Sequence, residues 1–334
     1  MPERRFLIVR LGSLGDIIHT LPAAAALRDS FPDAQIDWVV ESKWRAILEG
    51  NRDLNRVIPL DRGRASGAVA TVKSLRGARY TCAIDFQSLY KSALLAFASG
   101  ASERFGFDRE YAREALATIF YTRRIHPSGA HKVEHNLALA AAAGAAMPKV
   151  ARFTLPALVE AEEWADRKFA GLEAKGFCIL CPGGGWHSKC WPTERYGDLQ
   201  REISSQLGLQ GIVSFGPGEE NLADEVVAAS GLRAPIPLEM DLPHLMAALR
   251  RAKFLVAADT GPLHLASALG TPVIGLFGPT DPARNGPYGK PSIVVRKAQS
   301  GETTYKRGAS YSPAMMRIEV SDVMAAIGRL LVPR

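Results

Sequence analysis

Charged side chains follow four apolar runs of the sequence, at the points where strands are predicted to end. Asp16 follows residues 5–11, Lys189 follows residues 177–181, Glu219 follows residues 212–215, and Asp259 follows residues 254–258. A turn from a strand into a helix presents unpaired backbone N–H groups and the positive end of the helix dipole, which suit an anionic group such as a phosphate. Ligands of open α/β sheets bind at these strand ends. The pattern therefore predicts a site for a phosphorylated ligand.

The densest of these signals lies in residues 254–282, FLVAADTGPLHLASALGTPVIGLFGPTDP. An apolar run ends in Asp259-Thr260-Gly261, and a helix pattern follows at once. A second apolar run, residues 272–277, ends in a similar polar turn, residues 278–281, so that two neighbouring strand ends can face one ligand. For DTG alone the simpler interpretation is that Asp259 caps the helix and the glycines turn the chain.

A glycine-rich turn, CPGGGWHSKCWP, follows the strand at residues 177–181. Gly183, Gly184 and Gly185 allow the backbone to approach a ligand closely, and Lys189 can reach a phosphate as a point charge. In the turn after residues 212–215, Glu219 or its neighbour Glu220 is placed to bond ribose hydroxyls. The N-terminal turn, Gly12 to Asp16, lacks the third glycine of a dinucleotide fingerprint and the residues of a P-loop, and Asp16 at a helix start is ordinarily an N-cap.

Composition limits the class of protein. A length of 334 residues with 47% apolar residues predicts two domains, and the net charge of +7 fits a nucleotide, a nucleic acid or a membrane surface without selecting one. No apolar run approaches the roughly 20 residues that span a bilayer, and the N-terminus reads as a strand and not as a signal peptide, so a cytoplasmic protein is expected. Cys178 and Cys181 point to opposite faces of a strand and are predicted to be core residues. His131 and His135 have helical spacing but no third ligand, so we expect no essential metal and no cofactor.

Three motifs together resemble the ADP-heptose:lipopolysaccharide heptosyltransferases, glycosyltransferase family 9. They are RLGSLGDIIHTLPA at residues 10–23, K-x-W-P at residues 189–192, and DTG with LHLA and GPTDP at residues 259–282, and the resemblance extends over nearly the whole chain. It implies the α/β fold called GT-B, with two Rossmann-like α/β domains facing each other across a cleft. Residues 1–155 are then the acceptor-binding domain, residues 156–312 bind the ADP-sugar, and a helix in residues 313–334 packs back on the first domain.

The resemblance also assigns roles to single residues. It makes Asp16 the general base, and it implies that the donor nucleotide sugar is bound by Gly183, Gly184, Gly185, Lys189, Glu219, Met240, Asp259, Thr260, Gly261 and His264. The acceptor is bound by Gly15, Arg62, Arg64, Arg113 and His131. Arginine suits carboxylates because its planar fork can bind both oxygens.

The expected reaction is the transfer of L-glycero-D-manno-heptose from ADP-heptose to Kdo of Kdo-lipid A, with inversion of the anomeric centre. The partners are then ADP-heptose and a lipid acceptor at the inner leaflet of the inner membrane, with the enzyme peripheral on the cytoplasmic face, with no transmembrane segment and no nucleic acid. Within the family, the resemblance of the segment SLGDIIHTLPA favours the enzymes that add the first heptose. The alternatives are a sibling transferase for a second or third heptose or another ADP-sugar, a sugar-nucleotide epimerase, and a nucleotide- or glycan-binding protein without activity.

Overall fold

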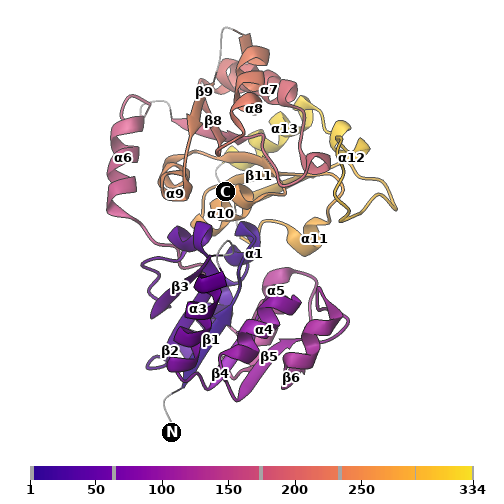
Figure 1. Ribbon diagram of the computed structural model, residues 1–334. Coiled ribbons are helices and arrows are strands. Elements are labelled where there is room, and N and C mark those ends of the chain that lie inside the picture. Colours follow the sequence, from indigo (N-terminus) through magenta and orange to yellow (C-terminus); the bar gives the residue numbers. More distant parts are fainter. Residues whose placement is uncertain (1–3, 62–64, 173–175, 232–234, 290, 333–334) are drawn as a thin grey trace. The chain divides into compact units, whose positions relative to one another are not determined.

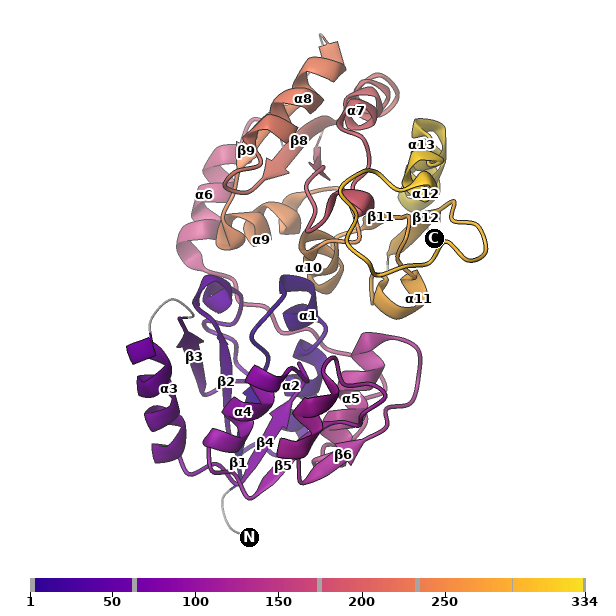
Figure 2. The ribbon, with the colours of Figure 1, turned by 45° about the vertical axis from the view of Figure 1, so that its right-hand side comes forward.

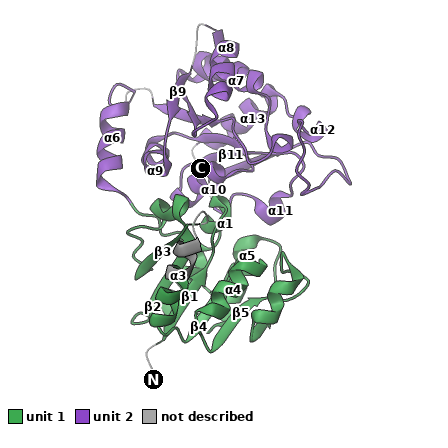
Figure 3. Cartoon of the chain, viewed as in Figure 1, with its two compact units in different colours: residues 1–156 green, residues 157–334 purple. Residues whose placement is uncertain are grey.

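The computed structural model describes residues 4–61, 65–172, 176–231, 235–289 and 291–332. Contacts divide the chain into two compact units, Met1–Pro156 and Ala157–Arg334, shown in green and purple in Figure 3. Each unit is built on its own parallel sheet with helices packed around it (Figure 1). The units are described separately below.

The first unit is an α/β unit in which strands and helices alternate along the chain. Its strands are β1 Arg5–Val9, β2 Gln35–Glu41, β3 Arg56–Leu60, β4 Cys82–Asp85, β5 Glu103–Phe107 and β6 Arg123–Ile125. Its helices are α1 Leu14–Ile18, α2 Leu21–Ser30, η1 Ser42–Ile47, α3 Ala65–Gly77, α4 Tyr90–Ala98, η2 Ala115–Phe120 and α5 Lys132–Ala142.

The second unit repeats this organisation. Its strands are β7 Phe177–Cys181, β8 Gln210–Phe215, β9 Ile236–Glu239, β10 Leu255–Ala258, β11 Val273–Phe277 and β12 Ser292–Arg296. Its helices are α6 Val159–Phe169, η3 His187–Lys189, α7 Thr193–Leu207, α8 Glu220–Ser230, α9 Leu242–Arg251, α10 Gly261–Leu269, α11 Pro282–Asn285, α12 Pro313–Met316 and α13 Val320–Leu331.

Both sheets have the strand order of a Rossmann fold. The described strands run β3-β2-β1-β4-β5-β6 in the first unit and β9-β8-β7-β10-β11-β12 in the second, and all pairs are parallel. In each sheet the strand order reverses between the first and the fourth strand, and ligands of such sheets bind at the carboxyl ends on either side of that reversal. The reversal lies between β1 and β4 in the first unit and between β7 and β10 in the second, so the loops that follow these strands are the candidate site in each unit.

The local sequence explains why the helices start at these strand ends. In α10, Thr260 is the N-cap in an extended conformation, Pro262 occupies the first turn, and Gly270 ends the helix with a φ of 83°. That φ lies in the left-handed region, which glycine adopts without a steric penalty. The strands are apolar because a parallel sheet is covered on both faces, and β1, β7, β10 and β11 are almost wholly buried.

The C-terminal helix α13 packs within the second unit. It lies against α7, β11 and β12, and Val323, Ala326 and Ile327 are part of the core of that unit (Figure 2). The segment that leads into α13 is held there, because the indole Nε1 of Trp191 and the guanidinium of Arg195 both donate to the carbonyl oxygen of Ile318. Within the described part of the chain, no helix combines the length and apolar character that a membrane crossing requires.

Candidate active site

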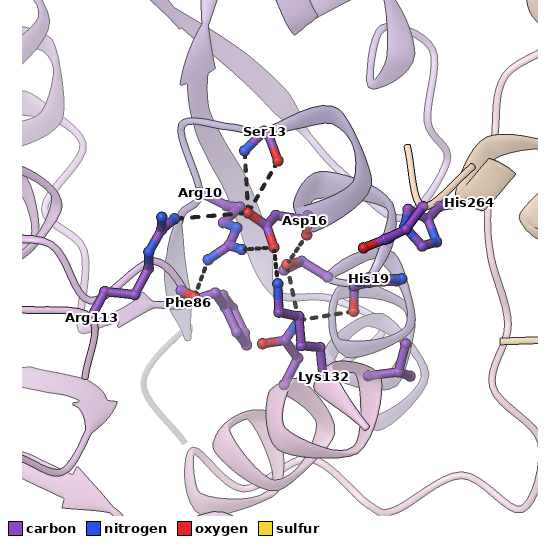
Figure 4. Close-up of polar contacts among 12 residues, drawn as sticks. Arg10, Ser13, Asp16, His19, Phe86, Arg113, Lys132 and His264 are labelled. Atoms are coloured by element: carbon purple, nitrogen blue, oxygen red, sulfur yellow. Dashed lines mark hydrogen bonds and ion pairs between the residues drawn. The ribbon is translucent and has the colours of Figure 1, made fainter. Parts of the chain in front are cut away.

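Asp16 is the centre of a charged cluster in the first unit (Figure 4). It lies in the first turn of α1, the helix that follows β1, and its side chain is 9% exposed. Its Oδ1 is 2.8 Å from the Arg10 guanidinium and 3.0 Å from Lys132 Nζ, and its Oδ2 is 4.0 Å from Arg113. Ser13 donates to Oδ2 through its backbone N–H and its hydroxyl group. The N-cap of α1 is Ser13, so Asp16 is not the cap itself but the third residue of the helix.

The buried Arg10 side chain is also held by the loop after β4, the neighbouring strand at the reversal. Its guanidinium also donates to the carbonyl oxygen of Phe86, in the loop after β4. That loop is organised by Asp85, which is fully buried and accepts hydrogen bonds from the backbone N–H groups of Gln87 and Ser88 and from the hydroxyl of Tyr121. Because the guanidinium is bonded to Phe86 on one side and to Asp16 on the other, it keeps Asp16 in one orientation.

The electrostatic environment keeps Asp16 ionised. Burial by itself raises the pKa of a carboxyl group, but the positive charges of Arg10 and Lys132 outweigh burial and hold the pKa of Asp16 well below its usual range. Asp16 is therefore a carboxylate at neutral pH, with two bound cations and a third cation, Arg113, near its other oxygen.

The predicted acceptor residues fall into three groups. Arg113 is exposed and directed at Asp16, and Gly15 precedes Asp16 in α1. His131 is the N-cap of α5, where its Nδ1 accepts from the N–H of Val133, and its ring lies edge-on to His19 at 5.2 Å. Arg62 and Arg64 lie outside the described residues.

In the second unit, Lys189 and Asp259 meet across the strand reversal. Lys189 Nζ lies 2.7 Å from Asp259 Oδ2, and His264 Nε2, from the first turns of α10, lies 3.1 Å from Oδ1. Burial raises the pKa of Asp259, but the hydrogen bond and charge of His264 and the charge of Lys189 outweigh it and lower the pKa. Lys189 Nζ also lies 4.4 Å from the centre of the Trp186 ring.

The glycine turn lies beside these residues. A Cβ atom on Gly184 would come within 2.9 Å of Cys190 Sγ and 3.4 Å of the Thr260 methyl group, so the turn packs against the start of α10. A Cβ atom on Gly183 would come within 2.4 Å of Glu219 Oε1. A side chain at Gly183 would displace the Glu219 carboxylate, and one at Gly184 would press on Cys190. Gly185 is exposed and has no such neighbour among the described residues.

The proximity of Gly183 distinguishes Glu219 from Glu220. Glu219 is the N-cap residue of α8, and its carboxylate accepts from the N–H of Gly216 and lies against Gly183. Glu220 is fully exposed, and its carboxylate accepts from the N–H of Gly218. Met240 is buried directly after β9, and its N–H donates to the carbonyl oxygen of Phe215. The strand order β10-β7-β8-β9 thus puts the start of α10, the glycine turn, Glu219 and Met240 side by side along one edge of the sheet.

Sequence reasoning missed Arg10 and Lys132, the two cations bonded to Asp16. Arg10 is the first residue of RLGSLGD, and a basic residue at the end of a buried strand was a usable signal. Lys132 lies 116 positions from Asp16, and nothing local in the sequence connects the two. A second omission is the segment before α12, where Gly308 exchanges hydrogen bonds with Ser188 and Arg307 lies 5.7 Å from the Trp186 ring.

Cys178 and Cys181 are core residues, as predicted. All four cysteines are buried free thiols, and burial raises the pKa of Cys178 and of Cys181 to about 12, so they stay protonated. Across the described ranges, no three His, Cys, Asp or Glu side chains are grouped so that they could hold a metal ion.

Comparison with known proteins decides the family. Residues 68–314 match the family model described as Glycosyltransferase family 9 (heptosyltransferase). The chain belongs to this family. It is therefore a glycosyltransferase, and the two-unit GT-B fold predicted from the sequence is confirmed.

Several heptosyltransferases resemble this family member closely. Lipopolysaccharide heptosyltransferase 1 of Escherichia coli strain K12 is 33% identical over 309 residues, which cover 87% of this chain and 93% of that protein. Lipopolysaccharide heptosyltransferase 2 of the same strain is 24% identical over 98% of this chain and 99% of that protein. Among solved structures, E. coli heptosyltransferase WaaC with ADP has a TM-score of 0.78 at 28% identity, and WaaC with ADP-2-deoxy-2-fluoro heptose has a TM-score of 0.76 at 29% identity. Both matches cover 97% of this chain and 99% of the other.

Proposed function

We propose that this glycosyltransferase moves L-glycero-D-manno-heptose from ADP-heptose to Kdo of Kdo-lipid A, with inversion, and so adds the first heptose of the lipopolysaccharide inner core. The observation that carries the proposal is Asp16, a buried and ionised carboxylate at the strand reversal of the first unit, held by Arg10 and Lys132 and faced by the exposed Arg113. The higher identity to heptosyltransferase 1 than to heptosyltransferase 2 supports the first heptose.

The proposed step is a single displacement in which Asp16 is the general base. The acceptor hydroxyl oxygen forms a bond to the anomeric carbon of heptose while the bond from that carbon to the diphosphate oxygen breaks. The hydroxyl proton goes to Asp16, and the electron pair of the broken bond leaves with ADP. The low pKa of Asp16 keeps it deprotonated but makes it a weak base. A weak base suffices because the acceptor oxygen gains positive charge as the new bond forms, which makes its proton strongly acidic.

The second unit supplies the donor site in this proposal. Lys189 meets the charge that develops on the departing diphosphate. Asp259 holds the lysine in place and is itself bonded to His264. Thr260 and Gly261 present the start of α10 to the phosphates, and Asp259 also binds heptose hydroxyls. Gly183, Gly184 and Gly185 allow the nucleotide to approach the backbone, Glu219 binds the ribose, and Met240 lies beside the adenine ring. WaaC, the relative with ADP and an ADP-heptose analogue in its structures, supports this donor.

The first unit supplies the acceptor site, with Gly15 and His131 near the base. Arg113, together with Arg62 and Arg64, binds the carboxylates and phosphates of the acceptor. Because that acceptor is a lipid, the enzyme is proposed to work at the cytoplasmic face of the inner membrane.

The decisive experiment is incubation with ADP-heptose and de-acylated Kdo-lipid A, followed by mass spectrometry for ADP and a product that is one heptose heavier. A reaction without acceptor tests for an epimerase, and an acceptor that already carries one heptose tests for a sibling transferase. Transfer to the bare Kdo acceptor supports the proposal. Faster transfer to the heptosylated acceptor, or epimerised nucleotide in the absence of any acceptor, contradicts it.

A further inference from the structure

Large apolar side chains are exposed together on one side of the first unit, on α4 and η2. We define the outer apolar patch as Tyr90, Leu94, Phe97, Leu116 and Ile119. The α4 members recur at a helical spacing of four and three residues, so they share one face of the helix. Their exposed fractions run from 43% to 66%, although side chains of this kind are normally buried.

The two elements that carry these side chains pack against each other. The ring of Phe120, in η2, lies 5.3 Å from the ring of Tyr90 and 5.6 Å from that of Phe97, and so joins the two elements. Beneath it, Ala93 of α4 and Ala117 of η2 are buried against each other with Tyr121. The inner face of the α4–η2 pair is thus already packed, and the outer apolar patch is surplus to the core. Figure 2 shows α4 on the outside of the first unit's sheet.

The edge of the patch is basic. Arg104 lies 5.5 Å from the centre of the Phe97 ring and donates to the carbonyl oxygen of Phe120. Arg124 donates to the carbonyl oxygen of Thr118, and Lys91 is exposed on α4 beside Tyr90. Residues 115–126 contain two arginines and no acidic residue. Of the acidic residues that adjoin these segments in the sequence, Glu103 is exposed, and the carboxylate of Glu114 accepts from the N–H of Tyr90. An apolar centre with a cationic margin matches a surface that offers acyl chains below anionic headgroups.

The patch is also close to the proposed base. The guanidinium of Arg113 lies 4.0 Å from Asp16, and the Cα atoms of Arg113 and Leu116, three residues apart, are separated by no more than about 11 Å. The loop is tied to the strand reversal, because the N–H of Glu114 donates to the carbonyl oxygen of Ser88. An acceptor sugar attached to a lipid must meet Asp16 while its acyl chains stay in the bilayer. A bilayer contact within one short segment of Asp16 satisfies that requirement.

We propose that the outer apolar patch binds the surface of a bilayer that contains anionic phospholipid, with Leu116 and Ile119 inserted among the acyl chains and the surrounding cations at the headgroups. This inference rests on the proposed function for its argument from the lipid acceptor, but not for the patch or its charge. A second copy of the chain fits less well, because two basic margins would then face each other.

The test compares the full-length protein with Leu116→Ser/Ile119→Ser in sedimentation with vesicles. The vesicles contain phosphatidylglycerol and phosphatidylethanolamine, with phosphatidylcholine vesicles as the neutral comparison. The matched control is Met147→Ser/Val150→Ser, which removes two apolar side chains of the same unit that are 58% and 82% exposed but outside the patch. We expect the patch variant to bind the anionic vesicles at least about tenfold more weakly, because two inserted side chains are lost. The control variant should bind like the wild type, and raising the salt from about 0.05 to 0.5 M should weaken wild-type binding.

Two activity measurements separate this inference from the proposed function. Turnover of de-acylated acceptor in solution should be the same for the patch variant and the wild type, whereas turnover of acceptor embedded in vesicles should fall in the variant. If the wild type does not use the soluble acceptor, the proposed function fails and the vesicle result still stands by itself. Equal vesicle binding by wild type and patch variant overturns the inference. So does wild-type protein that ignores anionic vesicles, or that forms a dimer which the patch variant abolishes.

Discussion

Replacing Asp16 with asparagine removes one negative charge and keeps the size of the side chain. In the folded protein this leaves Arg10, which is 6% exposed, without its carboxylate, whereas Lys132 is 31% exposed and can turn towards water. Removing one partner of a buried ion pair typically costs about 3–5 kcal/mol, and the amide oxygen still accepts a hydrogen bond, so we expect a loss near 3 kcal/mol. For a unit of 156 residues this corresponds to a fall in Tm of roughly 6–12 °C.

The same substitution also removes the proposed base. An amide cannot take the acceptor's proton, and a positioned base contributes about 10²–10⁴-fold to the rate. The loss of kcat should therefore be far larger than any loss of folded protein at 25 °C, because the remaining stability still keeps nearly all molecules folded. ADP affinity should not change, since the residues proposed to bind ADP belong to the second unit.

Asp37 provides the matched control for Asp16→Asn. It is a fully buried carboxylate of β2, and it accepts from the Arg56 guanidinium and from the hydroxyl of Tyr80. Asp37→Asn should also lower the free energy of unfolding, although Arg56 is 47% exposed and can turn towards water, and it should leave kcat within about threefold because its loss is structural only. The assays are urea unfolding and ADP release with saturating ADP-heptose and de-acylated acceptor.

The reasoning fails if Asp16→Asn keeps most of its kcat, because the mechanism then lacks a base. It also fails if Asp37→Asn loses as much kcat as Asp16→Asn, since the effect would then follow stability and not proton transfer.

Three further predictions follow from the same contacts. Lys132→Met removes a cation that holds the pKa of Asp16 low, so the pKa of Asp16 should rise and the acidic limb of the kcat/KM profile should move to higher pH. The shift has this sign because Asp16 is active as the carboxylate, and activity is lost as the pH falls through its pKa. Lys132→Arg should keep the wild-type profile. An unmoved limb in the methionine variant would show that Asp16 does not govern it. Lys189→Met should weaken ADP binding about tenfold or more in calorimetry, as a charge-assisted contact is lost, and tighter binding of UDP than of ADP by the wild type would contradict the donor assignment. Alanine at Arg62, Arg64 and Arg113 together should raise the acceptor KM in a salt-dependent manner and leave ADP affinity unchanged, and unaltered acceptor kinetics would exclude these arginines from the site.

Much of the fold could be predicted because buried parallel strands are continuous apolar runs. The strands β1, β7, β10 and β11 fall within the apolar runs named above, and the run at residues 212–215 lies within β8. Strands β5, β6, β9 and β12 were not predicted. β6 is three residues long, β9 contains Pro237, and both are edge strands that are partly exposed, so neither has the apolar character of a buried strand. The amphipathic pattern of α13 predicts that one face of the helix is buried, but not which helices and strands cover that face.

By itself the sequence determined which residues end the strands, and therefore Asp16, Lys189, Glu219 and Asp259 as candidates, because a strand-to-helix turn is encoded by a few adjacent residues. Only the tertiary structure showed that Lys132 and Arg10 hold Asp16, that His264 and Lys189 share Asp259, and that Glu219, not Glu220, lies against the glycine turn. These pairs lie up to 116 positions apart in the chain, and they meet because the sheet order places the ends of particular strands side by side. The sequence specifies which side chains are charged, but the ion pairs that they form depend on how distant segments fold together.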